Sequence, residues 1–330
     1  MAAVGNGGLT LTDLATRMEG DSVAKNIIEI LNKTNEVLED IPFIECNDGS
    51  AHKTTVRTGI PSATWRQLNY GVTQTKSTTA QIKDACGMLE NYSTVDSALV
   101  SLAGDKKAFR MSEDAPFVEG MNQGFLDTMI YGNTAVNPDR FMGLAPRFSV
   151  KSGAESGDNI LLGGGSGSTN TSIWLVVFGP NTVSGLYPKG SMAGLHMKDL
   201  GEQTVYDANN NPYQAMRSHY KWDCGLTVRD WRYIVRIANV DVSALTKNAA
   251  TGADLIDLMT QAMEQVRDLN AGSPAILCNR TIRSFLRRQM VNKSNVHLDM
   301  DEVAGKKVLT FDGVPVRRVD SIVNTEATIA

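Results

Sequence analysis

The segment from residue 51 to residue 83 constrains the fold most, because it carries one sign of charge and few residues that could form a core. It contains five basic residues and neither Asp nor Glu, whereas the whole chain contains 36 acidic residues. Its two ends are strand-prone, and Gly59, Pro61 and Gly71 interrupt the middle. This segment, called the basic arm from here on, is therefore predicted to be an extended hairpin. Its basic residues are Lys53, Arg57, Arg66, Lys76 and Lys83.

A hairpin of this composition needs a partner for its stability. Two isolated strands are marginally stable in water, so we expect the basic arm to bind an acidic surface of a neighbour. This expectation favours a protein that functions by assembly. The predicted contact residues are the five basic residues of the arm together with Trp65 and Tyr70. The predicted acidic counter-surface consists of Glu113, Asp114, Glu119, Asp299, Asp301 and Glu302.

Length and composition exclude several classes of protein. With 330 residues the chain can form one large domain or two ordinary ones, and its apolar content of 42% argues against disorder. A net charge of -4 argues against bulk binding of nucleic acid but leaves passive proximity to DNA open. The longest apolar run, residues 173–178, is far shorter than the roughly 20 residues that span a membrane. The N-terminus lacks the features of a secretory signal, so we expect a cytosolic product with reduced thiols.

The residues that could carry chemistry form no recognisable site. His219 and Cys224 have an odd spacing, which places them on opposite faces of a strand. The glycine-rich run 163–168 lacks the Lys-Ser/Thr ending of a P-loop, and we interpret it as a flexible surface loop. The acidic group at 299–302 lacks the glycine and distal glutamate of a calcium loop, and we interpret it as a solvated turn. We therefore expect no cofactor, no metal and no enzymatic activity.

Periodicity and turn residues predict helices and strands without regular βαβ alternation, which indicates an α+β fold. Gly120 and Gly124 weaken one expected helix, so a neighbour should pack closely on that face. A phase change predicts a bulge at Arg229–Asp230, and a hairpin should turn at Asp312-Gly313. The four arginines of the helix capped by Asn279 could touch nucleic acid, although a solvated or inter-subunit face is the more common outcome. Helices are expected near 12–18, 21–38, 93–103, 112–131, 251–269 and 279–288, and strands near 173–178, 220–237, 274–278 and 308–323.

Several segments, taken in order, resemble the major capsid proteins of tailed bacteriophages, in the short-tailed branch. No single segment is decisive, but the collinear set runs over nearly the whole chain and is quite specific. The segments are TVRTG at 55–59, WRQLNYGV at 65–72, FMGLAPR at 141–147, YPKGS at 187–191, HYKW at 219–222 and GLTVRD at 225–230.

The resemblance implies the Hong Kong phage type of capsid fold. That α+β fold has an N-terminal arm, an extended hairpin called the E-loop, a peripheral domain with a long spine helix, and an axial domain. The expected segments are 1–48 for the N-terminal arm, 49–84 for the E-loop, 85–150 for the peripheral domain with its spine helix, 151–305 for the axial domain, and 306–330 for C-terminal strands that return to the peripheral domain.

The implied function is self-assembly into pentamers and hexamers that form an icosahedral shell around the double-stranded DNA genome of the phage. Implied partners are identical subunits, a portal, a separate scaffolding protein and, as a further candidate, a decoration protein. The packaged DNA would lie close to the protein without sequence-specific contacts, and no membrane would be involved. The protein would assemble in the host bacterial cytoplasm and become part of the virion. Some members form a lysine-to-asparagine cross-link from this arm, which nothing around Lys76 supports. The alternatives are a virion decoration or adaptor protein and a soluble oligomeric enzyme with an unrecognised site.

Overall fold

The chain divides into two compact units. Unit 1 contains residues 1–34, 88–127 and 194–223, and unit 2 contains residues 35–87, 128–193 and 224–330. The computed structural model describes residues 18–19, 22–23, 36–102, 105–247, 249, 251–292, 298–303 and 306–330. None of the helices in these ranges is long and apolar enough to cross a membrane.

The two helices expected before residue 38 fall mostly outside the described residues. Where the structure describes this region, strands β1 (Met18–Glu19) and β2 (Ser22–Val23) pair in antiparallel orientation. The helix start expected at Ser22 is therefore wrong. After the described chain resumes, a short 3-10 helix occupies Val37–Asp40 and strand β3 occupies Phe43–Glu45.

Unit 2 is built on a sheet whose central strand, β8 (Asn170–Phe178), is buried at every residue. Strands β12 (Ile234–Asp241) and β13 (Ser273–Cys278) lie on its two sides, both antiparallel to it. A continuous apolar run is typical of a strand covered on both faces, which explains why 173–178 was predicted correctly. The strand expected at 274–278 is also confirmed. The outer strands are β7 (Ile160–Leu162) beside β12, β9 (Val183–Tyr187) beside β8, and β3 beside β9.

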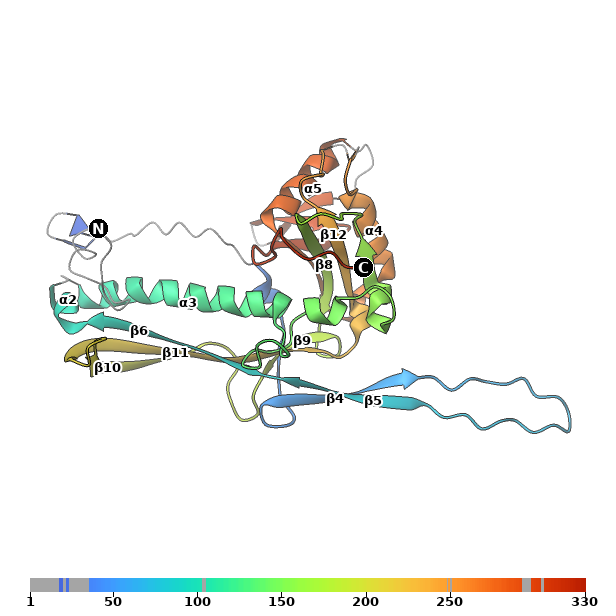
Figure 1. The fold of residues 1–330 in the computed structure, drawn as a ribbon, viewed down its shortest axis with the longest axis horizontal. Helices are drawn as coiled ribbons and strands as arrows, with labels where there is room; N and C mark the ends of the chain where they lie inside the picture. The colour runs from blue at the N-terminus through green and yellow to red at the C-terminus, as the bar shows by residue number, and fades with distance from the viewer. Residues whose placement is uncertain are drawn as a thin grey trace. The chain divides into compact units, whose positions relative to one another are not determined.

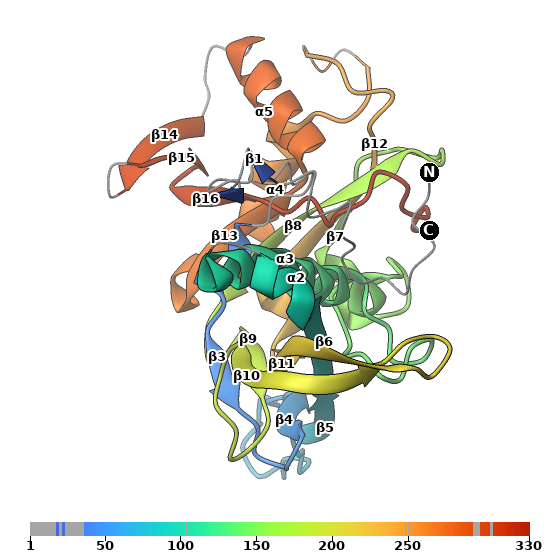
Figure 2. The same cartoon turned by 90° about the vertical axis from the view of Figure 1, so that its left-hand side faces the viewer.

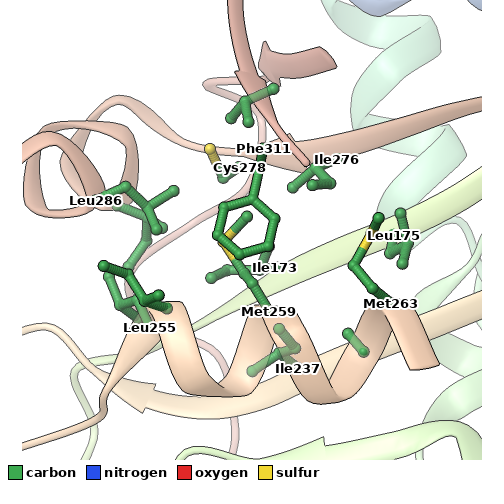
Figure 3. Packing of buried hydrophobic residues seen from close by; sticks show 14 of the residues in the cluster. Ile173, Leu175, Ile237, Leu255, Met259, Met263, Ile276, Cys278, Leu286 and Phe311 are labelled. Carbon is green, nitrogen blue, oxygen red and sulfur yellow. The ribbon is translucent and has the colours of Figure 1, made fainter. Parts of the chain in front are cut away.

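Two helices, α4 (Leu255–Gln265) and α5 (Arg280–Asn292), lie next to β8 and β12 in Figure 1. The Asn279 side chain caps α5 as expected, since its oxygen accepts a hydrogen bond from the Ile282 N–H at 3.0 Å. The cap of α4 is Asp254 rather than Thr251, so this helix begins later than predicted. Figure 3 shows the core that results, and its labelled members are Ile173, Leu175, Ile237, Leu255, Met259, Met263, Ile276, Cys278, Leu286 and Phe311.

The C-terminal strands complete this sheet. Strand β16 (Val314–Arg318) runs parallel to β13, and β15 (Lys306–Phe311) pairs with β16. The hairpin turn at Asp312-Gly313 is confirmed, with positive φ values of 48° and 78° that suit these two residue types. Strand β14 (Leu298–Val303) pairs with β15, and Figure 2 shows the three strands next to one another. The acidic group at 299–302 therefore lies in a strand and not in a turn, which corrects the expectation.

Unit 1 contains most of the longest helix, α3 (Lys106–Tyr131), which ends as expected just before Gly132. It begins six residues before Ser112, because the Asp105 carboxylate accepts hydrogen bonds from the N–H groups of Lys107 and Ala108. Among the described residues, no atom lies within 4 Å of a Cβ built on Gly120, whereas the Leu89 side chain lies 3.9 Å from one built on Gly124, so the packing expected on this face is observed only at Gly124. The other elements of unit 1 are α2 (Ser97–Leu102), β6 (Gly87–Asp96), β10 (His196–Tyr206) and most of β11 (Pro212–Val228).

The segment between β11 and β12 explains the change of side-chain phase near residue 230. Strand β11 ends at Val228, and β12 begins only at Ile234. The 3-10 helix Trp231–Tyr233, capped by Asp230, separates them. The expected bulge is therefore wrong, because two strands and a turn account for the pattern. Further 3-10 helices occupy Ala145–Phe148, Glu155–Asn159 and Leu269–Ala271.

Candidate functional site

The basic arm forms the hairpin that its composition predicts. Strands β4 (Ala51–Gly59) and β5 (Thr78–Ala85) pair in antiparallel orientation and form a two-stranded sheet of their own. Lys53 lies opposite Lys83, so the pairing places two like charges together near the base of the hairpin. Figure 1 shows the long connection between the two strands as a loop at the end of the hairpin.

The end of the hairpin exposes apolar side chains of unusual size. Trp65 is 101% exposed, Ile60 is 88% exposed and Leu68 is 86% exposed. All seven predicted contact residues of the arm are exposed, so the structure brings them into one element. Lys53 forms an ion pair with Asp48, at 2.7 Å between Nζ and Oδ2. Contiguous exposed apolar surface is typical of sites that bind another molecule.

The base of the hairpin is anchored by a buried carboxylate that sequence reasoning missed. Asp84, near the end of β5, is 5% exposed and forms an ion pair with Arg147 at 2.7 Å. It also accepts a hydrogen bond from the Thr227 hydroxyl at 2.7 Å. The Arg147 guanidinium donates in addition to the Gly143 carbonyl. The signal in the sequence was that Asp84 is the first acidic residue after the acid-free segment.

Across the hairpin from Asp84, His52 is also buried. Its Nε2 atom lies 2.9 Å from the Arg229 guanidinium and must accept the hydrogen bond, because arginine only donates. Burial, and then the charge of Arg229, lower the pKa of His52. The residue is therefore neutral near pH 7. Asn47 adds a further anchor, since its side-chain amide both donates to and accepts from the backbone of Lys53 at 2.8 Å.

The predicted acidic counter-surface is not exposed as a whole on the single chain. Glu113 and Asp114 are buried, and Asp114 accepts a hydrogen bond from the Ser218 hydroxyl at 3.2 Å. Glu119 is half-buried and accepts from Gln123 at 3.0 Å. The other three members, Asp299, Asp301 and Glu302, lie in β14, and their side chains fall outside the described part of the chain. Binding of the basic arm by these residues stays a prediction.

The arginine-rich outer side of α5 is confirmed and lines a shallow depression of about 550 Å³. Its charge is partly neutralised within the chain. Arg283 forms an ion pair with Glu36 at 3.1 Å, and Arg280 and Arg318 share Asp320. The residues that line the depression are Arg280, Arg283, Ser284, Arg287, Arg288 and Arg318.

In the described ranges, no group of three His, Cys, Asp or Glu side chains is placed to hold a metal ion. His219 instead stacks on Tyr92, with ring centroids 4.5 Å apart, and pairs with Glu90 at 3.2 Å. In the glycine-rich loop after β7, Gly165 lies close to β12, because a Cβ there would lie 2.7 Å from the Asn239 carbonyl oxygen, whereas residues 166–168 are exposed.

Three solved structures illustrate what this chain is similar to. A chain in the near-atomic-resolution structure of bacteriophage Epsilon15 is 43% identical, with a TM-score of 0.74, and the match covers 100% of this chain and 99% of that one. The capsid of bacteriophage JBD30 gives 9% identity over 95% and 99% of the two chains, with a TM-score of 0.49. The encapsulin SrpI of Synechococcus elongatus PCC 7942 gives 11% identity over 71% and 97%, with a TM-score of 0.46. Among curated proteins, none matches the chain.

The whole-length similarity to Epsilon15 confirms the expected α+β fold of the tailed-phage capsid type. The sequence model of the family described as major capsid protein GP7 matches residues 19–330, which is most of the chain. The chain therefore belongs to the GP7 family of major capsid proteins.

Proposed function

We propose that copies of this capsid protein form rings of five and six, and that these rings close into an icosahedral shell around a double-stranded DNA genome. In this proposal the basic arm is the contact by which one subunit reaches the next. The observation that carries it is an anchored hairpin with its large apolar side chains in solvent. Membership of a capsid protein family provides the identical neighbours that such a hairpin needs.

The dimensions of the arm suit a contact between subunits. Strand β4 contains nine residues, and at about 3.3 Å per residue it extends roughly 30 Å before the loop begins. Each contact can be weak, because a closed shell holds every subunit through several contacts at once. Burying the exposed Trp65 and Ile60 side chains would contribute about 1.5–3 kcal/mol each.

We propose the capsid names for the parts of the chain on the same basis. Residues 49–84 would be the E-loop, 1–48 the N-terminal arm and α3 the spine helix. Residues 194–223 lie in unit 1 together with α3, which supports assigning them to the peripheral domain rather than to the axial domain. Residues 306–330 lie in unit 2, where β15 and β16 extend the sheet of the expected axial segment, and this supports placing them there.

The remaining partners follow from the same role. The proposal includes a portal, a separate scaffolding protein and a decoration protein as a further candidate, with assembly in the host bacterial cytoplasm. DNA would lie near the inner wall without sequence-specific contacts. A purely structural role is supported by membership of the capsid protein family.

Reversing charge on the basic arm tests the proposal. In the double variant Arg57→Glu/Arg66→Glu, assembly should fail while the subunit stays folded, because both side chains are solvent-exposed. The free energy of unfolding should change by less than about 0.5 kcal/mol. Electron microscopy and urea titration would measure the two effects. The matched control is Arg57→Lys/Arg66→Lys, which keeps both charges and should assemble. Normal shells from the charge-reversed variant would contradict the proposal.

A further inference from the structure

Two cysteines meet at the base of the basic arm. Cys46 directly follows β3, and Cys86 directly follows β5, so together they bracket the hairpin. Their Sγ atoms lie 3.3 Å apart, although the residues are 40 positions apart in the sequence. In the structure all four cysteines of the chain are thiols, and Cys224 and Cys278 are both buried.

The backbone around both thiols is held in place. The Cys46 N–H donates to the Tyr187 carbonyl at 2.9 Å, and the Cys86 N–H donates to the Ser50 carbonyl at 2.8 Å. Gly225 of β11 lets the backbone approach Cys86, because a Cβ at this glycine would lie 3.1 Å from the Cys86 Cα and 3.2 Å from its Sγ. The thiol of Cys86 is thus confined between β11 and Cys46. Forming a disulfide requires the sulfurs to approach from 3.3 Å to about 2.05 Å.

We propose that Cys46 and Cys86 are a disulfide-forming pair that clamps the base of the basic arm when the protein meets a small-molecule disulfide such as oxidised glutathione. The inference rests on the geometry of these two thiols and is independent of the assembly proposed above. A metal ion is a weaker explanation for the pair, since no third His, Cys, Asp or Glu joins it in the described residues.

The exchange proceeds in two balanced steps. Cys86 is the partly exposed thiol, and its thiolate attacks one sulfur of the small disulfide, forming a mixed disulfide and releasing one small thiolate. Cys46 then loses its proton and attacks the Cys86 sulfur, forming the protein disulfide and releasing the second small thiolate. Both small thiolates take up the protons that the cysteines lost. Two protein thiols are oxidised and one small disulfide is reduced to two thiols.

The order of the two cysteines follows from their surroundings. Burial raises the pKa of Cys46, which makes it the poorer first nucleophile. Cys278 provides an internal reference, because full burial raises its pKa to about 12. The resulting cross-link would close a loop that contains the whole hairpin, which limits the motion of the arm at its base.

The test uses the full-length chain under native conditions. The protein is incubated with oxidised glutathione, remaining thiols are blocked with N-ethylmaleimide, and peptides are identified by mass spectrometry. A Cys46–Cys86 cross-linked peptide that dithiothreitol removes is the expected result, with Cys278 still reduced. Persistence of both thiols, or a glutathione adduct on Cys86 without any cross-link, would overturn the proposal.

A single variant separates the two steps, and a stability measurement tests the clamp. In Cys46→Ser, Cys86 should accumulate as the mixed disulfide with glutathione, because the adjacent Cys46 thiol that would displace the glutathione is gone. In the chain with both cysteines, oxidation should raise the urea concentration at the midpoint of unfolding, and dithiothreitol should reverse this rise. The Cys46→Ser variant should show no such reversible rise. A fully cross-linked chain with an unchanged midpoint would overturn the clamp.

Discussion

Two tryptophans of the same chain show opposite environments. Trp174 of β8 is 0% exposed, and its ring lies against Phe148, with centroids 6.0 Å apart, and beneath the Arg236 guanidinium. Trp65 of the basic arm is 101% exposed. The sheet of unit 2 therefore buries its large apolar side chains within one chain, whereas the arm leaves such side chains in solvent. The sheet of unit 2 and the helices packed on it, called the body from here on, thus differ from the basic arm in how they treat large side chains.

The same contrast holds for charge. In the body, Arg236 and Glu326 form a buried ion pair at 2.8 Å, and Ser172 and the Tyr131 hydroxyl also donate to the Glu326 carboxylate. Burial, and then the nearby carboxylate, raise the pKa of Tyr131, so its hydroxyl stays protonated as a donor. In the arm, charged side chains point into water. In the body, protein groups thus provide the charge and hydrogen-bond partners that water provides for the exposed side chains of the arm.

The largest expected effect breaks the body. In Glu326→Ala, the buried Arg236 loses its counter-charge, and the free energy of unfolding should fall by about 3–5 kcal/mol. Urea titration of the unassembled subunit measures the loss. The matched variant Trp65→Ala removes a larger side chain from the arm, yet it should change the free energy of unfolding by less than about 0.5 kcal/mol. Equal losses in the two variants would remove the distinction between body and arm.

An intermediate effect is expected at the junction between the two regions. In Asp84→Asn, the charge that holds Arg147 is lost, and the anchoring of the hairpin should weaken by about 1.5–3 kcal/mol. Hydrogen exchange should then be faster for the amides of β4 and β5 and unchanged for those of β8. The milder variant Thr227→Val, which removes one hydrogen bond to the same carboxylate, should cost about 1 kcal/mol. Faster exchange throughout β8 would show that the junction supports the body as well.

The elements that the sequence predicted correctly carry their signal locally. The apolar run of β8, the Asp312-Gly313 turn and the one-signed composition of the arm each depend on neighbouring residues. Helix starts were less predictable because several residues compete to cap them: Asp105 replaced Ser112, and Asp254 replaced Thr251. All four residues are Asp, Ser or Thr, which can each cap a helix, and tertiary packing decides between them.

The candidate site was predicted only in its exposed half. The contact residues of the arm could be selected because they share one continuous segment. The anchor could not, because Arg147 lies 63 positions from Asp84 and Arg229 lies 177 positions from His52. No periodicity or motif connects such pairs before the fold brings them together. The surface that the arm would bind is harder still to predict from the sequence, because it would lie on another subunit.

The smallest expected effect concerns the protonation of His52 at this junction. An ordinary histidine has a pKa of about 6.5, and burial together with Arg229 lowers the pKa of His52 in the folded chain. As the pH falls below about 6.5, the unfolded chain therefore binds protons at this position before the folded chain does. Stability contributed by neutral His52 is full above that pH and is lost as the pH falls through the lower, folded pKa.

Comparison with His52→Gln isolates this contribution from the other titrating groups. The glutamine side-chain oxygen can still accept from Arg229 but carries no proton that titrates. The protection of the β4 and β5 amides, measured relative to the intrinsic exchange rate at each pH, should therefore fall between pH 7 and pH 5 in the natural chain and much less in the variant. Protonated His52 would be repelled by the adjacent Arg229, and Asp84 is already paired with Arg147, so the junction should loosen before the sheet of unit 2 does. Identical pH profiles for the two proteins would mean that this buried histidine does not control how firmly the arm is held.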